Sequence, residues 1–153
     1  MLTLYTALKS LHVIAAIVWV GGGIASTVLM TRLRAARDPV VAIRMAANFE
    51  FLGTRVFTPA SILLILTGFA MIAEGSLEFE LWIILGLIAW LASAVNGGAF
   101  LGPQSQKLAA MQADAAPDAQ AVDAGLKRLM TFAMVDAAIL LLVVVDMVVK
   151  PGA

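Results

Sequence analysis

Four long apolar runs constrain the fold of this chain more than any other feature. They cover residues 11–30, 57–73, 81–101 and 129–149 of a 153-residue sequence that is 62% hydrophobic and 13% charged. A helix needs roughly 17–25 apolar residues to cross the hydrocarbon core of a bilayer. A helix also satisfies its own backbone in lipid, and these runs lack the alternation of barrel strands. We therefore predict an all-α integral membrane four-helix bundle, with residues 1–153 forming a single four-span transmembrane domain.

Composition excludes several classes of function. The chain has no cysteine, so disulfides, thiolate metal sites and cysteine nucleophiles are excluded. A formal net charge of zero argues against a nucleic-acid partner and leaves the lipid bilayer as the main partner. The first apolar run continues without a small-residue cleavage site, so we interpret it as a retained first span and not a removed signal peptide.

Basic residues in the connections predict the orientation. Eight lie in the first and third connections, against Lys9 and Lys150 on the other side. These eight are Arg32, Arg34, Arg37, Arg44, Arg55, Lys107, Lys127 and Arg128. Because cytoplasmic loops are enriched in Lys and Arg, we expect both termini outside and a multi-pass protein of the bacterial plasma (inner) membrane.

The first connection carries a helix signal of its own. Asp38-Pro39 combines an N-cap acid with a proline in the first turn. Polar and apolar residues then recur at helical spacing as far as Arg55. This pattern predicts a cytoplasmic amphipathic helix between the first and second spans, with a bend at Pro59.

His12 is the single histidine and lies about one turn inside the first span. Trp19 and Gly23 share its predicted helical face, so the imidazole would border a groove kept open by small residues. A flat ligand would fit such a groove. So would a second helix, because Gly22-xxx-Ser26 matches the small-xxx-small packing pattern of a homo-oligomer. A histidine that only hydrogen-bonds a neighbouring helix is the plainer alternative.

Three further residues fall at the depth of His12 if the spans are aligned. They are Met71 in the second span and Asp146 and Met147 in the fourth. Histidine with methionine is a plausible axial pair for haem iron, and the same donors suit copper(I). We therefore take His12, Trp19, Gly23, Met71 and Met147 as candidate cofactor-binding residues, with His12 as the metal ligand. Ordinary packing remains the alternative for each methionine.

A second polar layer lies nearer the cytoplasm. Asp136 and Asn96 are within apolar runs, while Arg32 and Arg55 lie at the inner ends of the first two spans. Asp136 in hydrocarbon should be paired, protonated or in contact with water. Pairing with Arg55 or Arg32, assisted by Asn96, is one interpretation. A proton or ion path to Asp146, about 15 Å further along the helix, is the other.

Three stretches resemble a bacterial family of predicted integral membrane proteins, domain of unknown function 2269. They are LYTALKSLHVIAAIVWVGGG, FTPASILLILTGFAM and VVVDMVVKP, and in this order they cover nearly the whole chain. More distantly, KSLHVIAAIVWVGG is similar to the first helix of the membrane protoporphyrinogen IX oxidases and of the membrane part of copper-resistance protein D. That similarity implies a ligand role for His12 and suggests a functional role for Lys9. The oxidase pattern is lost after Gly23, and a single histidine excludes bis-histidine ligation within one chain.

Three functions follow from these patterns. In the first, which we favour, the protein binds haem b or copper through His12 and serves a redox role. In the second, it is a non-enzymatic accessory or assembly subunit. In the third, it is a proton- or ion-coupled transport protein that uses Asp136 and Asp146. Whether the protein is an enzyme stays open.

Overall fold

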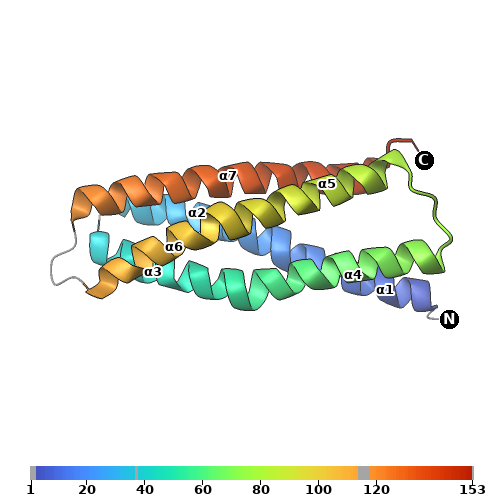
Figure 1. Ribbon diagram of the computed structural model, residues 1–153, viewed down its shortest axis with the longest axis horizontal. Helices are drawn as coiled ribbons and strands as arrows, with labels where there is room; N and C mark the ends of the chain where they lie inside the picture. Colours follow the sequence, from blue (N-terminus) through green and yellow to red (C-terminus); the bar gives the residue numbers. More distant parts are fainter. Residues whose placement is uncertain (1–2, 37, 114–117, 153) are drawn as a thin grey trace.

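The computed structural model describes residues 3–36, 38–113 and 118–152, and these residues form four long antiparallel helices (Figure 1). Arg37 of the sequence analysis lies outside the described residues. All four helices are long and apolar enough to cross a membrane. Their segments are α1 Leu4–Ala16, η1 Ile17–Gly21 and α2 Gly22–Ala36; α3 Pro39–Leu52, η2 Gly53–Phe57 and α4 Thr58–Glu74; α5 Leu81–Asn96, η3 Gly97–Leu101, α6 Gly102–Ala110 and η4 Met111–Ala113; and α7 Ala119–Val149. The predicted all-α membrane bundle is confirmed.

Side-chain caps set the start of three of these helices. The carboxylate of Asp38 accepts hydrogen bonds from the backbone N–H groups of Val40 and Val41, and Pro39 occupies the first turn of α3. Thr3 and Asp118 cap α1 and α7 in the same way. Caps of this kind satisfy backbone donors that have no partner in the first turn. The helix start predicted at Asp38-Pro39 is confirmed.

The helix predicted in the first connection continues directly into the second span. α3 passes through η2 into α4, which makes one helix of 36 residues from Pro39 to Glu74. At 1.5 Å per residue this helix is about 54 Å long, well beyond the roughly 30 Å of hydrocarbon in a bilayer. About 24 Å of this helix is therefore more than is needed to cross the apolar layer.

Wide π-helical turns interrupt three of the four helices. In two of these turns the cause is a proline. Pro59 and Pro103 lack a backbone N–H, and each ring opposes the carbonyl four residues earlier, within η2 and η3 respectively. The backbone N–H of Thr58 then reaches the oxygen of Gly53, and that of Gly102 reaches Gly97, both five residues back. The irregularity expected at Pro59 is thus a wide turn just before it. η1 contains no proline.

The two ends of the bundle are built differently. At the loop end, where α2 ends and α3 and α7 begin, α2 packs on α7 and α3 packs on α6. The main core lies there and consists of Met30, Ala42, Ile43, Ala46, Leu108, Val122, Leu126, Leu129 and Met130. At the terminal end, which carries both chain ends, α1 pairs with α4 and α5 with α7 (Figure 1).

The terminal end leaves most of its large apolar side chains on the outside. Leu142 is 71% exposed and Val148 is 79% exposed, and a small cluster of Trp19, Val20 and Leu140 is the buried core between the two helix pairs. In a bilayer these side chains can face lipid and need no buried core, because hydrocarbon tails are as apolar as leucine. The distribution of buried residues thus marks the terminal half as the part in the membrane.

Candidate functional site

His12, on α1, contacts α4 through one nitrogen of its ring. Its Nδ1 is 2.9 Å from the backbone oxygen of Leu64 and 3.1 Å from Oγ1 of Thr67. The imidazole also lies against Gly68, where an added Cβ would stand 3.4 Å from Cε1 of His12. A glycine at this position lets the ring lie close to the α4 backbone.

These partners fix which nitrogen of His12 carries the proton. A carbonyl oxygen only accepts, so Nδ1 must donate to Leu64. The hydroxyl of Thr67 already donates to its own helix, 2.7 Å from the oxygen of Leu63, so it too can accept from His12. In the neutral imidazole, Nε2 is then the unprotonated nitrogen, and it carries the lone pair that can bind a metal ion. Metal-binding histidines show this arrangement, since the nitrogen that does not bind metal donates to a carbonyl or carboxylate.

Two of the three other residues predicted at this depth, Asp146 and Met147, lie on α7 in the other helix pair. Met71 is half-buried on α4, the helix that faces α1. Met147 belongs to the other pair, where its thioether lies against Gly86 of α5. Asp146 is also on α7, and its Oδ2 is buried without a hydrogen-bond partner among the described residues. The predicted single layer of four side chains is therefore wrong for Asp146 and Met147, because α1 pairs with α4 and not with α7.

The small-residue face of the first span is also arranged differently from the prediction. Gly22 packs inward, where an added Cβ would stand 2.5 Å from Cε1 of Phe57, while Gly23 has nothing within 4 Å. Trp19 is buried in the small core with Leu140 of α7. The wide turn η1 interrupts the 3.6-residue period from which a common face with His12 was extrapolated.

Asp136 forms the second polar site, within the α5·α7 pair. Its Oδ1 accepts hydrogen bonds from Oγ of Ser93 at 2.7 Å and from Nδ2 of Asn96 at 3.2 Å. The predicted contact with Asn96 is confirmed. The predicted ion pair is wrong: Arg32 and Arg55 are exposed, and neither bridges to Asp136 among the described residues. Ser93 was missed because an isolated serine in an apolar run gives no sequence signal.

Comparison with known families agrees with this architecture. A family model described as "Predicted integral membrane protein (DUF2269)" matches residues 6–151. The chain belongs to the DUF2269 family. No curated protein and no solved structure matches it. Family membership and the four long apolar helices together make this DUF2269 chain a multi-pass integral membrane protein that sits in a lipid bilayer.

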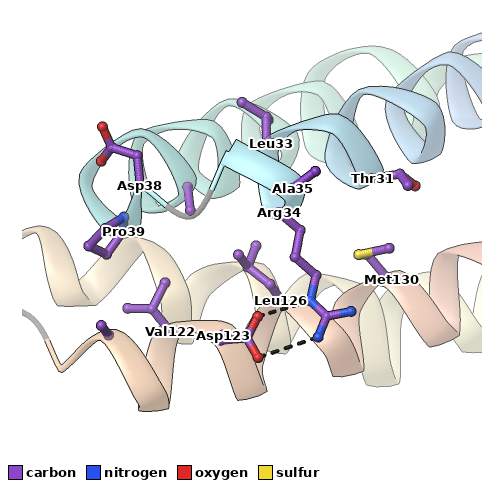
Figure 2. Close-up of a pocket in the computed structure, with 12 residues that line it drawn as sticks. Thr31, Leu33, Arg34, Ala35, Asp38, Pro39, Val122, Asp123, Leu126 and Met130 are labelled. Atoms are coloured by element: carbon purple, nitrogen blue, oxygen red, sulfur yellow. Dashed lines mark hydrogen bonds and ion pairs between the residues drawn. The ribbon is translucent and has the colours of Figure 1, made fainter.

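The DUF2269 chain also has a cavity of about 560 Å³ at the loop end, which the sequence did not indicate. Figure 2 shows Arg34 of α2 reaching across it to Asp123 of α7, with Nε of Arg34 2.9 Å from Oδ1 of Asp123. Leu126, Val122 and Pro39 contribute apolar walls. Both charged side chains are substantially exposed, and such surface pairs contribute about 0–1 kcal/mol. The cavity walls are therefore held mainly by the adjoining core.

A double-mutant cycle on His12 and Thr67 tests the inter-helix contact in this DUF2269 protein. We expect His12→Ala and Thr67→Val to be coupled by about 0.6 kcal/mol, the average for polar contacts between membrane helices, with an upper limit near 1.7 kcal/mol. The measurement is reversible unfolding of the four proteins in mixed micelles. Thr67→Ser keeps the hydroxyl and should retain the coupling; strictly additive effects of the two substitutions would contradict the contact.

Proposed function

We propose that this protein binds a metal-containing redox cofactor, haem b or copper, through Nε2 of His12 in the bacterial inner membrane. The observation that carries the proposal is the hydrogen bond from Nδ1 of His12 to the carbonyl of Leu64. In a neutral ring this bond leaves the lone pair of Nε2 available to a metal ion. Haem or copper would supply one-electron chemistry when bound. The chain supplies the ligand, holds its ring orientation through Thr67 and Leu64, and surrounds it with apolar helices.

The candidate metal ligands of one chain, a histidine and two methionines, fit a site with one strong protein ligand, the imidazole of His12. Met71 lies on the helix that faces α1, whereas Met147 packs on Gly86 in the other helix pair. A second strong ligand would then come from a second copy of the chain or from an exogenous molecule. Gly23, near the middle of the first long helix, has nothing within 4 Å of an added Cβ and leaves room for a second copy to approach.

The test is an absorption spectrum of the protein purified after expression with ample haem, recorded oxidised and then reduced, together with metal analysis. We expect a cofactor signal in the wild type that is lost in His12→Ala. Thr67→Val is the positioning variant. It should weaken the cofactor affinity about 10–100-fold, as happens at other metal sites when a group that hydrogen-bonds a metal-bound histidine is lost.

Two results would count against this function. Retention of haem or copper by His12→Ala would remove His12 as the ligand. A folded wild type without haem or copper after supplementation with both would leave the accessory-subunit function, in which His12 only joins α1 to α4. Thermal stability of each variant, followed by size-exclusion chromatography, separates loss of cofactor from loss of fold.

A further inference from the structure

Asp136 lies in an apolar environment in which its contacts are neutral. The two side chains that hydrogen-bond it, Ser93 and Asn96, are 3% and 8% exposed. From Leu81 to Leu101 the neighbouring helix carries no titratable side chain, and η1 carries none either. The other elements that pack against α7 carry charged side chains: Arg32 and Arg34 on α2, Arg44 and Glu50 on α3, and Lys107 on α6. Among the described residues none of them forms an ion pair or hydrogen bond with Asp136. On α7 itself, Arg128 and Asp146 are eight and ten residues away.

Both neighbours present a donor to the same carboxylate oxygen. Nδ2 of Asn96 also bonds to the backbone oxygen of Phe132 at 3.1 Å, which fixes the amide with its nitrogen toward α7, since a carbonyl only accepts. Ser93 donates to the same Oδ1. The second oxygen, Oδ2, has no hydrogen-bond partner among the described residues.

This arrangement favours a proton over a metal cation at Asp136. Calcium, a hard cation, takes six to eight oxygen ligands, and magnesium takes six. Here the polar neighbours of Asp136 aim N–H and O–H donors at it, so they are unsuited as cation ligands. A proton needs one free carboxylate oxygen, and Oδ2 supplies it. The charge of an unpaired carboxylate in hydrocarbon is costly, so a bound proton is the simplest way to neutralise it.

We propose that Asp136 is an intramembrane proton-binding site that takes up and releases one proton at Oδ2. On release, the O–H bond of the carboxyl breaks, the electron pair stays on the carboxylate, and the proton passes to water. Ser93 and Asn96 keep their hydrogen bonds to Oδ1 in both states and stabilise the charge when the proton is absent. The site is independent of His12, which lies on the other helix pair.

Infrared spectroscopy of the full chain in lipid vesicles tests this proposal. We expect a carbonyl stretch from a protonated carboxyl that is absent in Asp136→Asn, shifts in D₂O, and loses intensity as the pH is raised. Asp146→Asn is the matched control, because it removes a carboxyl of the same helix, and it should leave the assigned band in place. Ser93→Ala removes one donor to Oδ1 and should shift the band to higher frequency.

Each result either supports or contradicts the proposed proton-binding site at Asp136. Loss of the band in Asp136→Asn alone, with deuterium shift and pH dependence, supports the site. Absence of any band assignable to Asp136 shows an ionised carboxylate and overturns it. A band that ignores both D₂O and pH shows a trapped structural proton and overturns it as well. If Asp136→Asn does not fold, the shift in Ser93→Ala assigns the band, and the D₂O and pH responses of the wild type then decide.

Discussion

Substituting Gly22 by leucine is expected to destabilise the bundle strongly, because this glycine is the point of close approach between the first two long helices. Even a single added Cβ would stand 2.5 Å from Cε1 of Phe57 and 3.1 Å from its Cζ. Phe57 packs against the small core around Trp19 and Leu140, so its ring has little room to move. Overpacking of this kind costs about 1–3 kcal/mol, occasionally more, and leucine should reach the upper end. The midpoint of thermal aggregation in detergent, measured by size-exclusion chromatography, should fall by several degrees.

Gly23→Leu is the matched control for this experiment. An added Cβ at Gly23 meets nothing within 4 Å, so the same substitution one residue later should leave the melting temperature of the monomer nearly unchanged. Equal losses in the two variants would contradict the packing of Gly22 on Phe57. Since Gly23 is open, a change confined to the oligomeric mass of Gly23→Leu would instead point to a second copy of the chain at this face.

Leu108→Ala is expected to produce the other large effect, at the opposite end of the molecule. Leu108 is 0% exposed, and its side chain fills the space next to Gly125 of α7. Truncating a fully buried leucine costs about 2–5 kcal/mol, because the contacts are lost and the cavity closes only partly. The measurement is the free energy of unfolding in mixed micelles with increasing denaturant.

A lipid-facing leucine provides the comparison for Leu108. Leu142 is 71% exposed in the membrane half, so Leu142→Ala leaves no internal cavity and should change the free energy of unfolding by much less. If the two substitutions cost the same, the loop end would lack the tightly packed core that the structure shows there.

Much of the architecture follows from local properties of the sequence. The length and continuity of the apolar runs determine that the chain crosses the membrane as helices. Helices and closed barrels both satisfy the backbone in lipid, and these runs lack the alternation of barrel strands. Asp38-Pro39 and Asp118 determine where two helices begin, since capping depends on neighbouring residues alone. Pro59 and Pro103 mark two of the three wide turns for the same reason.

The candidate sites depended on helix rotation and pairing, which local patterns do not encode. His12 was recognisable as a polar group in lipid, but its partners Leu64 and Thr67 follow from the α1·α4 pairing. Met147 shares a predicted depth with His12, yet it packs in the α5·α7 pair. One interpretation of Asp136 pairs it with an arginine, assisted by Asn96. The contact with Asn96 is present, but Ser93 takes the place of the arginine because α5 presents that face to α7.

The sequence by itself determined the number of spans, the helix starts and the polar residues that lipid makes costly. The tertiary structure alone decided which of those residues meet. The physical reason is that the bilayer acts on each apolar run separately, whereas partner choice depends on shape complementarity between helices, such as Gly22 on Phe57 or Gly68 on His12.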